Sequence, residues 1–155
     1  MLSPELLRYY PFFAGLTNPQ LSSIAMLATE ETYPAGTILC EKGQPAETLY
    51  FLVDGCVDLY YPSDKISSSD FPQGIPIGEV NAGEPFSISA LIEPYRLTST
   101  AKVGRSSRVI EIEARSLRGL FRKDKRLAYL LTKQAAQAVR ARLETTRVQL
   151  AAALA

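Results

Sequence analysis

Glycines recur between short runs of β-branched, aromatic and apolar residues in the first half of the chain. Those that divide the runs are Gly36, Gly43, Gly55 and Gly83. Val, Ile, Tyr and Thr suit a pleated surface, and glycine adopts the backbone conformations that tight turns require. Dense strands separated by glycine turns, roughly ten residues apart, predict a β-sandwich or β-barrel.

Individual strands and loops follow from the same pattern. Asp54-Gly55 stands between two apolar runs, and such a pair is a strong signal for a two-residue hairpin. Residues 75–80 read as the next strand and residues 107–112 as the last. Residues 62–74 are rich in Ser, Pro and Gly and lack periodicity, which predicts an exposed loop between strands.

Helical periodicity is found at the two ends of the chain. Residues 4–13 form a short amphipathic segment interrupted at Pro11. Thr17 and Gln20 have the spacing of a capping box, which predicts a helix that continues to about Ala28. After Ala114 the chain becomes helical again, with a short helix over residues 116–124 and a long one from residue 127 to the end.

The long C-terminal helix carries apolar and small residues in steps of three and four, the pattern of a heptad seam. We expect this seam to form a homodimer, because a helix of this length has more apolar face than the β structure can cover. The alternative is that the helix folds back onto its own β structure. The seam residues are Tyr129, Thr132, Ala136, Val139, Leu143, Thr146, Leu150 and Ala153.

Composition limits the partners of the chain. The 155 residues predict one domain, and a net charge of +1 gives no general electrostatic attraction to nucleic acid or anionic lipid. Arg140, Arg142 and Arg147 are spread around the last helix, so we expect no nucleic-acid contacts. No apolar run approaches twenty residues and no secretory signal is visible, so we expect no membrane contact and a cytoplasmic location.

Residue types that carry common catalytic chemistry are scarce. The chain has no histidine, which excludes Ser-His-Asp triads, histidine acid–base catalysis and histidine metal ligands. Cys40 and Cys56 are the two cysteines, and we expect them to be buried apolar residues in strands. We therefore predict that the chain is not an enzyme, with no catalytic residues, no metal site and no cofactor.

Residues 83–103 combine a glycine turn, a short apolar run with Phe86, Ala90, Leu91 and Ile92, and a β-branched run. With these residues the segment resembles the phosphate-binding cassette of cyclic nucleotide-binding domains, the family of the catabolite activator protein and protein kinase A regulatory subunits. The cassette pattern is approximately F-G-E-x-A-L-(I/L), a short gap and R-(A/T)-A-x-V, and the turn glycines named above also fit the family. The resemblance implies a mostly β fold with flanking helices: a double-stranded β-helix, or jelly-roll-like β-roll, with N-terminal helices and a long C-terminal helix. It divides the chain into a β-roll domain, residues 1–126, and a dimerisation helix, residues 127–155.

The polar anchors of the family cassette are replaced by aliphatic residues. Aligned without gaps, the family's glutamate, which bonds the ribose hydroxyl, falls on Ile88, and its phosphate-binding arginine falls on Leu97. Arg96 stands one residue before the position of the family's phosphate-binding arginine, so its side chain would lie on the opposite face of a strand. A change in loop length before Arg96 could bring it into that position. The resemblance implies cassette positions at Phe86, Ser87, Ile88, Ser89, Ala90, Arg96, Leu97, Thr98 and Ser99, and base-facing positions at Arg142 and Leu143.

The resemblance predicts a regulatory module that senses a small-molecule ligand of uncertain identity. A cyclic nucleotide is a candidate ligand, but we expect cyclic AMP and cyclic GMP to bind weakly or not at all. The hydroxyls of Ser89, Thr98 and Ser99 could hold a smaller anion, another nucleotide or an uncharged metabolite. Arg142 could supply the missing positive charge. The alternative is a structural module that has lost its ligand, dimerises constitutively or docks onto a partner protein.

Overall fold

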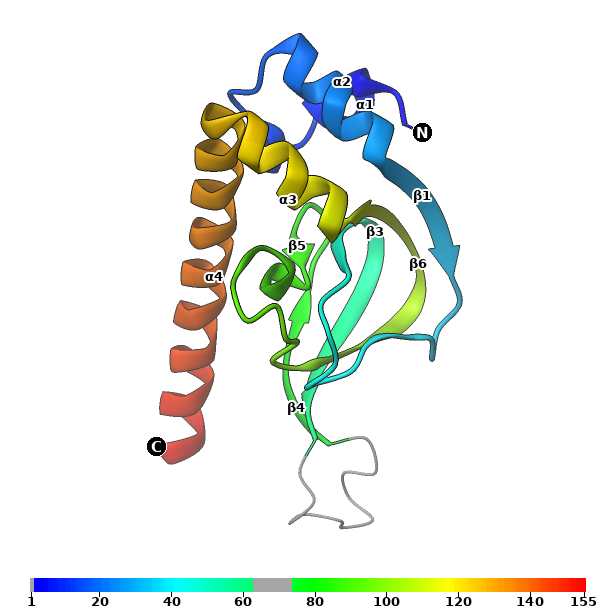
Figure 1. Ribbon diagram of the computed structural model, residues 1–155. Coiled ribbons are helices and arrows are strands. Elements are labelled where there is room, and N and C mark those ends of the chain that lie inside the picture. The colour runs from blue at the N-terminus through cyan, green and yellow to red at the C-terminus, as the bar shows by residue number, and fades with distance from the viewer. Residues whose placement is uncertain (1, 63–73) are drawn as a thin grey trace.

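The computed structural model describes residues 2–62 and 74–155 (Figure 1). Its helices and strands follow one another in the order α1 Pro4–Arg8, η1 Pro11–Phe13, α2 Asn18–Leu27, β1 Ala28–Tyr33, β2 Ile38–Cys40, β3 Thr48–Tyr61, β4 Ile75–Val80, β5 Pro85–Phe86, η2 Ile88–Leu91, β6 Thr100–Glu113, α3 Ala114–Lys123 and α4 Lys125–Leu154. The elements η1 and η2 are short 3₁₀ turns.

Two long antiparallel strands, β3 and β6, form the centre of the sheet. Each has 14 residues, and their pairing runs from Thr48 opposite Glu113 to Tyr60 opposite Thr100. The register shifts repeatedly between Leu52 and Val57, so both strands bend there. This bend divides the curved sheet into two halves and produces the β-roll.

The predicted hairpin at Asp54-Gly55 is wrong, because β3 continues through both residues. Gly55 has φ of 117°, and a Cβ atom there would collide with the side chain of Ser107 and lie 2.7 Å from its Cα. The glycine therefore permits a close crossing of β3 and β6. Ser107 is buried, and its Oγ accepts a hydrogen bond from the Cys56 amide at 3.1 Å, which satisfies a backbone group freed by the register shift.

The remaining strands pair with one half or the other of the two long strands. β1 pairs with the second half of β6, and β2 pairs with its beginning. β5 pairs with the first half of β3, and β4 with its second half. The predicted strand over residues 75–80 is β4, whereas the predicted last strand over residues 107–112 is only the second half of β6.

The N-terminal helices and α3 cover one end of the roll (Figure 1). The predicted capping box is present: the Gln20 amide donates to Thr17 Oγ1 and the Thr17 amide donates to Gln20 Oε1. Phe12 and Phe13 pack on Phe51 of β3, with ring centroids 6.0 and 5.5 Å apart. Burial of these apolar surfaces fixes the helices on the end of the sheet.

The long helix α4 runs along one side of the roll (Figure 1). Leu127, Leu131 and Ala135 are buried in the core, but from Leu143 onward every residue is exposed. The predicted division at residues 126 and 127 stays a prediction. Most of the predicted loop over residues 62–74 lies outside the described residues. In the part of the chain that the structure describes, no helix has the length and apolar character of a membrane span.

Candidate functional site

A cavity of about 480 Å³ lies between α4 and the segment that joins β5 to β6. This segment passes between α4 and the sheet, so the cavity has walls from both (Figure 1). Its lining residues are Cys40, Leu59, Ile77, Phe86, Ser87, Ile88, Ser89, Ile92, Glu93, Pro94, Arg96, Leu97, Thr98, Ser99, Ala101, Val139, Arg142, Leu143 and Thr146.

The cassette folds as a short helical turn, η2, between the strands β5 and β6. Phe86 ends β5 and stacks on Tyr50 of β3, with ring centroids 4.9 Å apart. Ser87 follows with φ of 60°, and this left-handed residue turns the chain into η2. Ile88 is buried at the start of η2 with 7% of its surface exposed. The aromatic stack and the buried isoleucine hold the turn against the roll.

The predicted site residues line this one cavity, with the exception of Ala90. Ala90 is fully buried, and its carbonyl accepts a hydrogen bond from Arg118 Nε at 2.8 Å. Arg118 also donates to the Ala46 carbonyl at 3.0 Å and stacks on the ring of Tyr95 at 3.8 Å. Ala90 is thus part of the contact between α3 and the cassette. That the other residues bind a ligand stays a prediction.

Arg96 and Leu97 differ in exposure. Arg96 is exposed, and its Nη1 donates to the Gly43 carbonyl at 3.2 Å at the edge of the cavity. Leu97 is half-buried and packs against both clusters of the apolar core. Its amide donates to the Gln44 carbonyl at 2.9 Å, which holds its backbone against the loop before β3. An aliphatic side chain thus occupies the more buried of the two positions.

Arg142 is the half-buried cation of the cavity. Its Nη2 donates to the Pro85 carbonyl at 2.8 Å, which joins α4 to β5. Burial lowers the pKa of Arg142 from its usual value, and the charge of Glu84 opposes this shift. Among the described residues, no carboxylate oxygen comes within 4.0 Å of the Arg142 guanidinium. The cation therefore reaches the cavity without a close ion-pair partner in that part of the chain.

Two polar side chains deeper in the cassette have unusual surroundings. The Ser87 hydroxyl oxygen is inaccessible to solvent and has no hydrogen-bond partner among the described residues. Cys40, on β2, is buried with 4% of its surface exposed, and burial raises the pKa of its thiol to about 12, a shift that the nearby Ser87 hydroxyl opposes. The thiol is protonated at neutral pH, so the cavity carries no thiolate from this residue.

Several cavity residues were not predicted from the sequence. Val139 and Thr146 lie three or four residues from both Arg142 and Leu143, the spacing of one helix face, so this signal was available. The strand residues gave no such signal, because an inward-facing apolar side chain looks the same in a core as in a cavity wall. These strand residues are Cys40, Leu59, Ile77 and Ala101.

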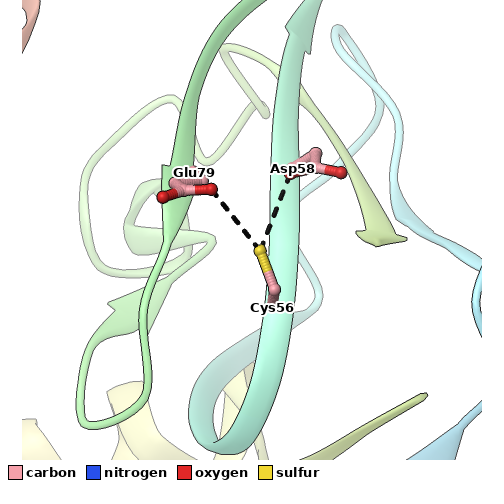
Figure 2. Close-up of side chains that lie close together, drawn as sticks. All are labelled: Cys56, Asp58 and Glu79. Carbon is pink, nitrogen blue, oxygen red and sulfur yellow. Dashed lines mark hydrogen bonds between the residues drawn. The ribbon is translucent and has the colours of Figure 1, made fainter. Parts of the chain in front are cut away.

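A second group of polar side chains lies where β3 pairs with β4 (Figure 2). Cys56 Sγ lies 3.7 Å from Asp58 Oδ1 and 3.6 Å from Glu79 Oε2. Cys56 and Asp58 are two residues apart on one face of β3, and Glu79 is the register partner of Asp58. Burial, assisted by both carboxylates, raises the pKa of the Cys56 thiol to about 11. The cluster therefore consists of a protonated thiol beside two acidic groups.

Comparison with known proteins identifies the family. The model of the cyclic nucleotide-binding domain matches residues 30–124. Over 86 residues the chain is 29% identical to glutaminase 1 from Bradyrhizobium diazoefficiens, a match that covers 56% of this chain and 12% of that protein. The chain thus spans a small part of the length of this curated relative.

Two crystal structures extend the likeness to the whole fold. A protein from Geobacter metallireducens GS-15, named for cyclic nucleotide binding, is 36% identical over 92% of this chain and 99% of its own, with a TM-score of 0.80. The sensor domain of the transcriptional regulator DNR from Pseudomonas aeruginosa shares the fold at 18% identity, over 90% of each chain, with a TM-score of 0.69. The chain therefore belongs to the cyclic nucleotide-binding domain family.

Proposed function

We propose that this domain is a regulatory module that senses a small molecule in the cavity between the cassette and α4. The observation that carries the proposal is that Phe86–Ser99 residues and α4 residues share one cavity of about 480 Å³, a volume typical of small-molecule sites. A ligand that fits this cavity contacts the roll and the helix together. Its binding free energy then differs between positions of α4, which is the requirement for coupling.

Ordinary cyclic AMP and cyclic GMP are poor ligands in this proposal. Ile88 and Leu97 occupy the family positions of the ribose-binding glutamate and the phosphate-binding arginine. A hydrogen bond to a charged group contributes about 1.5–3 kcal/mol, and a buried hydroxyl without a partner costs about 1–3 kcal/mol. Together these effects weaken binding by roughly two to four orders of magnitude.

Thermal unfolding with each nucleotide at millimolar concentration tests this expectation. The wild-type protein should show a marginal rise in Tm, whereas Leu97→Arg should bind cyclic AMP roughly tenfold to a hundredfold more tightly. Val148→Arg is the matched control, because it adds the same charge at an exposed apolar position outside the cavity lining. A large rise in Tm of the wild-type protein would contradict the proposed loss of cyclic nucleotide binding.

The second candidate function is a ligand-free module that dimerises constitutively or docks onto a partner protein. The observation in its favour is the exposure of apolar side chains on α4, among them Tyr129 (54%) and Leu150 (57%). Native mass spectrometry distinguishes the two: a sensor carries or accepts a small molecule, whereas the alternative gives a dimer with no added mass. A monomer that accepts no small molecule contradicts both the sensor and the constitutive dimer, and leaves docking onto a partner protein.

In either case we propose a homodimer through α4, a cytoplasmic location, and no membrane or nucleic-acid contacts by this domain. We also propose that the domain itself catalyses no reaction, in line with a family that is generally regulatory. The likeness to part of glutaminase 1 is compatible with a regulatory domain joined to a larger protein.

A further inference from the structure

We propose that the cavity binds a small organic monocarboxylate with an apolar body, whose charge pairs with Arg142 and whose oxygen accepts a hydrogen bond from Ser87. This inference rests on the proposed function, since it names the ligand class of the same cavity.

The walls of the cavity require an apolar ligand body. Leu59, Ile77 and Phe86 contribute from the strands, Leu97 from the cassette and Leu143 from α4. Apolar ligand surface gains free energy by leaving water for such walls. A nucleotide would bring sugar hydroxyls and base edges against these apolar walls, and those that found no partner among the serine and threonine hydroxyls of the lining would be costly to bury.

Arg142 requires an anion. Its guanidinium has five N–H donors, and the structure gives Nη2 one acceptor, the Pro85 carbonyl. A half-buried cation is stabilised when a carboxylate takes up its remaining donors, frequently as a bidentate pair. Arg96 is less suited to this role, because its side chain is exposed and water screens exposed ion pairs.

Ser87 supplies the second polar contact. Its Oγ is inaccessible and has no partner within hydrogen-bond distance among the described residues, although the Cys40 thiol lies near it and the residue borders the cavity. A ligand oxygen would satisfy this hydroxyl once rotation about the Cα–Cβ bond turns it toward the cavity, and this would remove the cost of leaving it without a partner. Ser87 follows Pro85 by two residues, so the hydroxyl and the Arg142 contact belong to the same short segment.

A single negative charge suits the site better than two. Glu93 lines the cavity, and Glu84 lies close enough to Arg142 to influence its charge. A dianion such as a phosphate monoester would be repelled by these carboxylates, and one half-buried cation would have to balance its two negative charges. A carboxylate matches the single charge of the half-buried Arg142 guanidinium and the buried hydroxyl of Ser87.

Isothermal titration of the full chain with sodium octanoate, octanamide, sodium acetate and cyclic AMP tests the inference. We expect octanoate to bind the wild-type protein and the other three probes to bind at least tenfold more weakly. Arg142→Gln should weaken octanoate binding roughly tenfold to a hundredfold, and Ser87→Gly, which suits the left-handed backbone, should weaken it severalfold. Arg140→Gln, the same change on an exposed residue of α4 outside the cavity lining, should leave the Kd unchanged.

Tm values of the ligand-free variants check that each one folds. Equal binding of octanoate and octanamide, loss of binding in Arg96→Gln instead of Arg142→Gln, or tighter binding of cyclic AMP would each overturn the pairing of a carboxylate with Arg142 and leave the sensing function intact. If none of the four probes binds, the carboxylate assignment fails. Native mass spectrometry of the protein as purified then decides on the sensing function separately.

Discussion

At the scale of single residues, the closest packing constraint lies where β3 crosses β6. Gly55 has no room for a side chain, because Ser107 occupies the space where a Cβ would stand. Ser107 Oγ in turn accepts a hydrogen bond from the Cys56 amide. The bend of the roll therefore depends on one glycine and one buried hydroxyl, although neither residue lies in the ligand cavity.

We predict that Gly55→Ala lowers the free energy of unfolding by about 2–4 kcal/mol, since it adds a clash and a strained φ. Gly119→Ala, in the middle of α3, should instead raise it by about 0.5–1 kcal/mol, because the added Cβ meets only the flexible Arg122 side chain, at 4.0 Å. Urea denaturation of both variants provides the measurement. Equal stability of Gly55→Ala and wild type would show that the crossing can relax.

A second residue-level prediction concerns the thiol of Cys56. Burial, Asp58 and Glu79 all raise its pKa, so the thiol should react slowly with a disulfide reagent at pH 8. Glu79→Gln removes one of the negative charges and should increase the reaction rate severalfold. The rate is measured in a Cys40→Ala background so that only one thiol reports. An unchanged rate would mean that the Glu79 carboxylate does not influence the thiol.

At the scale of elements, the start of α4 depends on Asp124. Its Oδ1 accepts a hydrogen bond from the Leu127 amide at 3.0 Å. Its Oδ2 accepts a hydrogen bond from Gln20 Nε2 at 3.1 Å, and this bond links α2 to α4. These two hydrogen bonds, the Leu127 bond first, lower the pKa of Asp124. The cap thus joins two helices that are distant in sequence.

This cap should make stability depend on pH. A lowered folded-state pKa gives stabilisation that is complete above the unfolded value of 3.8 and is lost as pH falls through the folded value. Asp124→Asn can still cap the helix but does not titrate, so its Tm should approach that of wild type as pH falls below 3.8. Gln137→Ala, an exposed change on the same helix that involves no titratable group, is the control and should keep a constant Tm difference from wild type.

The elements also show how far the sequence predicts the fold. Turn glycines, the capping box and the long helix were predictable, because each depends on local backbone geometry. The Asp54-Gly55 hairpin was not, since the same dipeptide also permits a bend in a continuous strand. Whether the chain reverses or bends depends on β6, more than forty residues away in sequence. The cavity had local signals in the cassette, but its strand walls had none.

At the scale of the whole molecule, α4 exposes an apolar stripe that the roll does not cover. Tyr129, Val139, Leu143 and Leu150 are each 45–57% exposed. Val139 and Leu143 also line the ligand cavity, so the predicted dimer seam and the cavity share residues. A second helix on this seam would lie beside the mouth of the cavity.

We predict a dimer in sedimentation equilibrium at micromolar concentration. Ala136→Glu places a charge in the seam and should give a monomer, because two like charges would face each other across the interface. Gln137→Glu, exposed and outside the seam, should remain dimeric. Circular dichroism verifies that both variants keep the helix. A monomeric wild-type protein would contradict the prediction that the seam forms a homodimer.

The central pairing of β3 with β6 also has a kinetic consequence. Its partners lie 40 to 65 residues apart along the chain, so the contact order of this domain is high. Loops of that length must close before the two strands gain the hydrogen bonds between them. Refolding followed by stopped-flow fluorescence should therefore take milliseconds to seconds. The N-terminal helices and α4 should not accelerate it, because the pairing of β3 with β6 limits the rate.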